Sequence, residues 1–153
     1  IGGDTEIVVK QATGQFDTGS PANPYPSISS THIGTITPSQ TITVQRLYTY
    51  HCPGTGGHAE SIELYENDTL IANDTWNGYK GDGHKITLNN VSGIPYVTLL
   101  KDHVYNYTIR TGSYPQIIHA KEFNATGGTI TCTEFTDANG KRYVDWIPAI
   151  RLE

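Results

Sequence analysis

The chain has no methionine and only two cysteines, and charged residues make up just 16% of its 153 positions. Disordered chains are highly charged and poor in aromatic residues. This sequence contains ten Tyr, three Phe and two Trp, so we expect it to fold. Its length is sufficient for one domain with a buried core.

Long apolar runs and a basic excess are also missing. No window approaches the roughly 18 consecutive apolar residues of a transmembrane helix, so no membrane span is predicted in this form of the chain. Ten Lys and Arg stand against fifteen Asp and Glu, which gives a net charge of −5. Because phosphate binding needs a basic face, we expect no nucleic-acid partner.

Two features predict where the protein is found. The first residue is Ile1 instead of Met, which is typical of a mature product whose leader has been removed. Chance predicts roughly two N-x-[ST] sequons at this Ser and Thr content. The chain has five, at Asn67, Asn73, Asn90, Asn106 and Asn124. We therefore expect N-linked glycans and an extracellular or cell-surface location.

The residues around one sequon also follow a strand pattern. Residues two apart in a strand share a face. Tyr105, Tyr107 and Ile109 are then predicted to face the core, while Asn106 and Thr108 face water together. An asparagine in that position is accessible for glycosylation.

The two cysteines are Cys52 and Cys132, an even number in a chain that looks secreted. A disulfide between them would close a loop of about 80 residues and restrict the unfolded chain. We expect this disulfide; two buried free thiols are the alternative.

Short β-rich runs punctuated by Gly, Pro, Asn and Asp recur along the chain, and no stretch has a helical apolar period. This pattern predicts an all-β fold, an antiparallel β-sandwich of jelly-roll type. Asp137–Gly140 is predicted to form a hairpin turn. The predicted strands are Glu6–Ala12, Gly34–Ile36, Thr41–Cys52, Ser61–Glu66, Thr69–Trp76, His84–Asn90, Tyr96–Leu100, Val104–Arg110, Ile117–Phe123, Thr129–Phe135 and Lys141–Ile147.

The N-terminal residues 1–26 differ from the sandwich predicted over residues 27–153. One good strand is followed by a spacer, Thr13–Tyr25, that is rich in Gly, Ser, Pro and Asn. The strand could fold back onto its own sandwich or add to a sheet edge of another molecule. Its residues are Glu6, Ile7, Val8, Val9, Lys10, Gln11 and Ala12.

Several longer stretches are distinctive. They are Leu47–His58, Gly78–His84, Tyr105–Gln116 and Asp145–Leu152. Together they resemble a β-rich domain that recurs in secreted and cell-surface proteins of methanogens and Archaeoglobus-like archaea. The resemblance covers residues 25–152 and implies the exterior of an archaeal cell. That family has no characterised function, so the resemblance implies no catalytic residues.

Histidines and one carboxylate lie close together in sequence around a glycine-rich loop. His51, His58, Glu60 and His84 are candidate ligands for Zn²⁺ or Cu²⁺, although their spacing matches no standard motif. Turns near Asp82 and Asp137 could bind Ca²⁺. No cofactor is required by the sequence, and exposed or hydrogen-bonded histidines are the alternative.

No hydrolase motif of the G-x-S-x-G kind surrounds any serine, so we expect no enzyme. The many tyrosines and tryptophans could stack on sugars, fill subunit interfaces or simply pack the core. A row of exposed Tyr or Trp on one sheet face would indicate glycan binding.

These features favour a structural subunit of an extracellular archaeal filament or surface coat. The N-terminal strand of one subunit would pair with a sheet edge of the next, with Ile7 and Val9 in an apolar groove, so the expected partner is a second copy in a homo-oligomer or homopolymer. The alternative is a cell-surface binding module for glycans or metal ions that does not polymerise.

Overall fold

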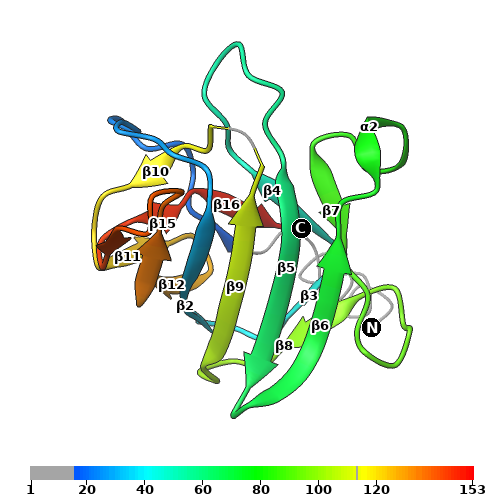
Figure 1. Ribbon diagram of the computed structural model, residues 1–153. Helices are drawn as coiled ribbons and strands as arrows, with labels where there is room; N and C mark the ends of the chain where they lie inside the picture. Colours follow the sequence, from blue (N-terminus) through cyan, green and yellow to red (C-terminus); the bar gives the residue numbers. More distant parts are fainter. Residues whose placement is uncertain (1–15, 113) are drawn as a thin grey trace.

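The computed structural model describes residues 16–112 and 114–153, which form an all-β, sandwich-like fold of antiparallel sheets (Figure 1). The four-stranded sheet has the order β1 (Phe16–Asp17), β16 (Ile150–Leu152), β4 (Arg46–Thr49) and β7 (Lys85–Thr87). The fold class expected from the sequence is therefore confirmed.

The eight-stranded sheet is the larger layer. Its main path is β11 (Glu122–Ala125), β12 (Gly128–Thr131), β2 (Thr31–Pro38), β9 (Tyr105–Thr111), β5 (Ala59–Glu66) and β6 (Thr69–Thr75). Off this path, β13 (Glu134–Thr136) pairs with β2 and with β14 (Arg142–Tyr143). Two small sheets pair β3 (Ile42–Val44) with β8 (Val97–Leu99), and β10 (Ile117–Ile118) with β15 (Ile147–Pro148).

Alternating side chains on the central strands build the core. Every second residue of β2 is buried, and on β9 the side chains of Tyr105, Tyr107, Ile109 and Thr111 point inward. The four-stranded sheet contributes inward-facing aliphatic residues such as Leu47 and Ile86. Because apolar residues of both sheets are packed in one cluster, the core lies between the two layers.

Aromatic rings fill one region of this core. Trp146 stacks on Phe135 with ring centroids 5.0 Å apart, and Tyr143 lies 4.5 Å from the same indole. His32 is fully buried beside Phe135, where its Nδ1 lies 3.2 Å from the carbonyl oxygen of Trp146. A large part of the aromatic content therefore serves packing.

The single run predicted over Thr129–Phe135 is divided into β12 and β13, which pair with different halves of β2. Gly34 of β2 permits this arrangement, because a Cβ there would lie 1.9 Å from the carbonyl oxygen of Thr131. The strand predicted over Thr41–Cys52 is likewise divided at Gln45, whose N–H donates to the carbonyl of Glu153 (2.6 Å). Periodicity located these strands but could not predict their interruptions.

The spacer prediction was wrong for its first described residues. Phe16 is fully buried and pairs with Leu152 across β1 and β16, while Asp17 bridges to Thr126. Burial of the phenyl ring of Phe16 in the core stabilises the pairing of these residues with the sandwich. The strand predicted over Glu6–Ala12 lies outside the described residues.

The expected disulfide is not present, because Cys52 and Cys132 are both buried free thiols. The two residues have different surroundings. The Cys52 thiol faces the carbonyl oxygen of Pro115 at 3.8 Å, whereas Cys132 follows β12 and its backbone N–H donates to Lys121 (2.9 Å). Burial raises the pKa of the Cys132 thiol.

Within residues 16–112 and 114–153, no helix is both long and apolar enough to cross a membrane. The helical segment α2 (Gly78–Gly81) is a single turn between β6 and β7.

Candidate binding site at the histidine-rich end of the sandwich

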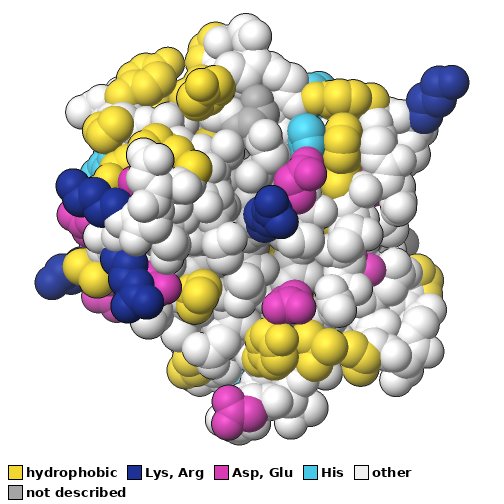
Figure 2. Space-filling view, in the orientation of Figure 1, with side chains coloured by type: hydrophobic (Ala, Val, Ile, Leu, Met, Phe, Trp, Pro, Cys, Tyr) yellow, Lys and Arg dark blue, Asp and Glu magenta, His cyan; other side chains and the backbone are white. Residues whose placement is uncertain are grey.

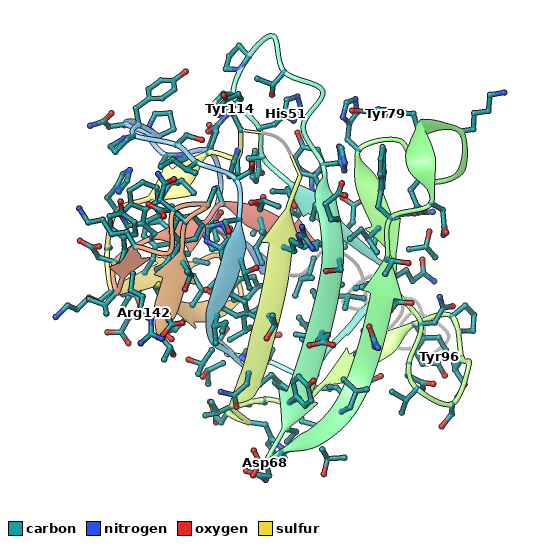
Figure 3. All side chains as sticks on the ribbon, in the orientation of Figure 1. His51, Asp68, Tyr79, Tyr96, Tyr114 and Arg142 are labelled. Atoms are coloured by element: carbon teal, nitrogen blue, oxygen red, sulfur yellow. The ribbon has the colours of Figure 1, made fainter. Side chains whose placement is uncertain are left out.

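Three connections between strands meet at one end of the molecule. They are the segment from His51 to His58 between β4 and β5, the segment with α2 between β6 and β7, and the segment after β9. Figure 3 shows His51, Tyr79 and Tyr114 at this end and Tyr96 near the other. Residues far apart in the sequence therefore share one surface.

Five rings form a continuous group here, which we call the histidine–tryptophan cluster: His51, His58, Trp76, Tyr79 and His84. His58 stacks on Trp76 with centroids 3.6 Å apart, and Tyr79 meets that indole edge-on at 4.8 Å. Tyr79 also contacts His84 (5.5 Å), which stacks on His51 (5.1 Å). Tyr79 is half exposed, so the cluster is open to solvent.

Two glycines allow the loop to pack on these rings. A Cβ at Gly57 would lie 1.8 Å from the Cβ of His51, and one at Gly56 would lie 2.5 Å from the hydroxyl of Tyr79. Only residues without a side chain permit this approach. The glycine-rich loop is therefore a packing requirement of the cluster.

Hydrogen bonds to backbone carbonyls orient the rings. The indole N–H of Trp76 donates to Gly83 O at 3.0 Å, and the Nδ1 atoms of His58 and His84 lie 3.0 and 2.8 Å from Gly56 O and Gly57 O. The hydroxyl of Tyr79 also donates to Gly56 O. The Nδ1 of His51 is buried and has no partner among the described residues.

A polar cleft of about 330 Å³ adjoins the cluster. Glu60 connects the two, because its carboxylate contacts the Nε2 of His58 and also lines the cleft. The backbone of Gly112 closes this corner, since a Cβ there would lie 2.8 Å from the same Nε2. The cleft is lined by Ser29, Ser30, Glu60, Arg110, Thr111, Gly112 and Ala138.

Charged, imidazole and hydrophobic side chains lie side by side over the upper part of β9, β5 and β7 in Figure 2. Arg110 is exposed near the end of β9, and Glu60 is exposed near the start of β5. The cleft thus presents a guanidinium and a carboxylate next to aromatic faces.

The predicted metal ligands come together only in pairs. His58 contacts Glu60, and the rings of His51 and His84 stack. Stacked imidazoles present their faces to each other, not their nitrogen lone pairs. No group of three or more His, Cys, Asp or Glu able to hold a metal ion occurs in the part of the chain that the structure describes.

The Asp137 turn is a hairpin, as its sequence predicts. The carboxylate accepts hydrogen bonds from the N–H groups of Asn139 (2.8 Å) and Lys141 (3.0 Å), and Gly140 has a φ of +84°. The bond from Lys141 is the largest cause that lowers the pKa of Asp137. The other carboxylate oxygen accepts from the hydroxyl of Tyr143 (3.1 Å), so both oxygens already have hydrogen-bond donors.

Four of the five predicted glycosylation sites are exposed. Asn67, Asn73, Asn106 and Asn124 are exposed, and Asn106 lies between two buried tyrosines as predicted. Asn90 is partly buried, and its Oδ1 accepts hydrogen bonds from the backbone N–H groups of Ser92 (2.8 Å) and Ile94 (3.1 Å).

A second concave surface, which we call the edge groove, lies at the opposite end of β5 and has a volume of about 420 Å³. It runs between the first residues of β6 and strand β8. Exposed apolar side chains surround it, including Val91, Tyr96 and Leu100. Its lining is Glu66, Thr69, Leu70, Ile71, Asn90, Val91, Ser92, Tyr96, Val97, Thr98, Leu100 and Tyr105.

Exposed tyrosines do not form the row on a sheet face that would indicate a glycan platform. The exposed tyrosines are Tyr25, Tyr79, Tyr96 and Tyr114. Tyr79 and Tyr114 lie at one end of the molecule and Tyr96 near the other (Figure 3). Sequence reasoning also missed Arg110 and the serines of the cleft, because no local motif surrounds them. The glycine-rich loop was the available signal for this end.

Comparisons with models of protein families, with curated proteins and with solved structures found no match to this chain.

Proposed function

We propose that this protein is a structural subunit of an extracellular filament or surface coat, in which the N-terminal strand of one subunit occupies the edge groove of the next. The edge groove carries this proposal, because it lies between the first residues of β6, which is the last strand of its sheet, and strand β8, which pairs with β3 alone among the described residues. A binding module that does not polymerise is the competing function.

The strand edges suit an added strand. β6 is the last strand of its sheet, and β8 pairs with β3 alone among the described residues. A bridge between Ala72 and Asn90 covers part of β6, but Thr69 and Leu70 line the groove. Backbone N–H and C=O groups along open edges are the usual template for strand addition.

The donated segment matches the groove chemically. Alternation puts Ile7 and Val9 on one face of the segment Glu6–Ala12, with Val8 on the other. The groove offers Leu70, Val97 and further apolar side chains as their neighbours. Burial of these residues supplies the driving force for association.

The test compares the full chain with a variant that lacks residues 1–15, by light scattering and negative-stain microscopy. We expect filaments or large oligomers of the full chain and monomers of the truncated variant. Adding a synthetic peptide of residues 1–15 to the truncated variant should give a one-to-one complex.

A substitution in the edge groove distinguishes strand donation from nonspecific association of apolar surfaces. Val91→Glu should prevent assembly, whereas Val144→Glu serves as the matched control, because both valines are exposed (59% and 51%) and only Val91 lines the groove. Assembly that survives truncation contradicts the proposal. A full chain that is monomeric, with a truncated variant that binds the peptide, would show insertion in the same chain and also overturn it.

A further inference from the structure

The cleft beside the histidine–tryptophan cluster combines two kinds of surface. Its polar side has the Glu60 carboxylate, the Arg110 guanidinium and the hydroxyls of Ser29 and Ser30. The rings of the histidine–tryptophan cluster lie beside it, and Tyr79 among them is half exposed. A volume of about 330 Å³ lies at the lower end of the range for small-molecule sites.

The two surfaces are held in a fixed relationship. The backbone N–H of Trp76, directly after β6, donates to the carbonyl of Glu60 on β5 at 3.0 Å, so the indole and the carboxylate come from neighbouring positions of the two chain segments. His58 stacks on that indole and contacts the Glu60 carboxylate. The site is therefore organised before any ligand arrives, which reduces the entropy lost on binding.

We propose that this cleft binds a saccharide, with a pyranose ring that packs on Tyr79 and the His58–Trp76 stack. A pyranose has an apolar C–H face, which suits the rings of the cluster, and a rim of hydroxyls, which suits the polar lining of the cleft beside them. The planar carboxylate of Glu60 accepts from two neighbouring hydroxyls, and the planar guanidinium of Arg110 donates to two. The ligand could be part of a free polysaccharide or of an N-linked glycan on another subunit.

The saccharide site is independent of the edge groove. Glu60 and Glu66 are six residues apart on β5, or about 20 Å in an extended strand. Glu60 lines the cleft and Glu66 lines the groove. Loss of one function by substitution should therefore leave the other intact.

The experiment is an NMR titration of the isotope-labelled full chain carrying Val91→Glu, which keeps it monomeric if the groove mediates assembly. The probes are methyl mannoside, N-acetylglucosamine and glucuronic acid at millimolar concentrations. We expect saturable shifts of the indole N–H of Trp76 and of the backbone N–H of Gly112 with at least one probe. A second arm uses glycopeptides from the protein's own sequons, and tighter binding there identifies the N-linked glycan as the source.

Variants of exposed side chains test the assignment. Tyr79→Ala and Arg110→Ala should each weaken binding about tenfold, the effect of losing about 1.4 kcal/mol. Tyr96→Ala is the matched control, because this tyrosine is also exposed but lines the edge groove. The absence of saturable shifts with every probe, shifts confined to the groove, or equal effects of Tyr79→Ala and Tyr96→Ala would overturn the proposal.

Discussion

The imidazole of His58 stacks on the indole of Trp76, with ring centroids 3.6 Å apart and planes inclined by 19°. The two residues flank the hairpin of β5 and β6, whose register pairs Ser61 with Thr75. That register is set by the turn at Asn67 and Asp68 together with a β-bulge between Leu64 and Tyr65, where the pairing shifts by one residue. The geometry of the candidate site therefore depends on a turn at the opposite end of the sandwich.

Replacing Asp68 with Gly should stabilise this hairpin. Asn67 and Asp68 have φ values of +50° and +67°, the pattern of a type I′ turn, in which Asn-Gly is the preferred pair. Asp68 is exposed, so the substitution removes backbone strain without loss of packing. The relief of left-handed strain, about 1–2 kcal/mol, exceeds the entropic cost of a glycine in the unfolded chain, about 0.5–1 kcal/mol. We therefore expect a net gain of about 0.5–1 kcal/mol in the free energy of unfolding, measured by urea denaturation. Asp68→Val, a β-branched residue at the same φ, should lower it.

The loop that supports the cluster should not tolerate a methyl group at Gly57. The added Cβ would lie 1.8 Å from the Cβ of His51, so the loop or the His51 backbone must shift. We expect Gly57→Ala to cost about 1–3 kcal/mol and to change the chemical shifts of the His51 and His84 rings. Gly54→Ala is the control for the same loop, because its Cβ meets nothing within 4 Å and only its φ of +82° is strained. Equal ring shifts in both variants would contradict the steric explanation.

Local patterns in the sequence predicted the strands of the hairpin and the two-residue gap between them, because alternation and turn residues are local signals. The same patterns identified His58 and Glu60 as neighbours. They could not predict that Trp76 lies against His58, since this contact depends on the register across the hairpin. The contribution of Arg110 to the cleft depends on pairing between β9 and β5, which is also nonlocal.

Reducing agent should leave the stability unchanged. Cys52 and Cys132 are buried and unlinked, so no covalent crosslink restricts the unfolded chain. Dithiothreitol should not shift the thermal midpoint, and two thiols should react with iodoacetamide after denaturation without reductant. In the native state this reaction should be slow, because both thiols are nearly inaccessible. A thermal midpoint that falls on addition of dithiothreitol would contradict the free thiols and support the disulfide expected from the sequence.

Glycan occupancy should differ among the five sequons. Asn67, Asn73, Asn106 and Asn124 are exposed, whereas Asn90 is partly buried, accepts two backbone hydrogen bonds and lines the edge groove. We expect glycopeptide mass spectrometry of the native protein to find Asn90 the least modified. Asn106→Gln should remove one glycan without loss of stability. Full occupancy at Asn90 would conflict with a strand bound in that groove.

Acidification should destabilise the fold through His32. Complete burial lowers the pKa of His32 from 6.5 to about 3, and the hydrogen bond to the Trp146 carbonyl opposes this shift only in part. Between these two values the unfolded chain binds the additional proton, so the free energy of unfolding falls as the pH decreases through this window. For this group alone the expected loss is about 2 kcal/mol between about pH 7 and pH 5. NMR titration should show the His32 ring neutral across that range.

Two variants test the role of His32. His32→Asn, whose amide can still donate to the Trp146 carbonyl, should reduce the pH dependence of the free energy of unfolding, whereas His119→Asn, at an exposed position, should not. A His32 ring that titrates near its ordinary pKa in the folded protein would contradict the burial argument.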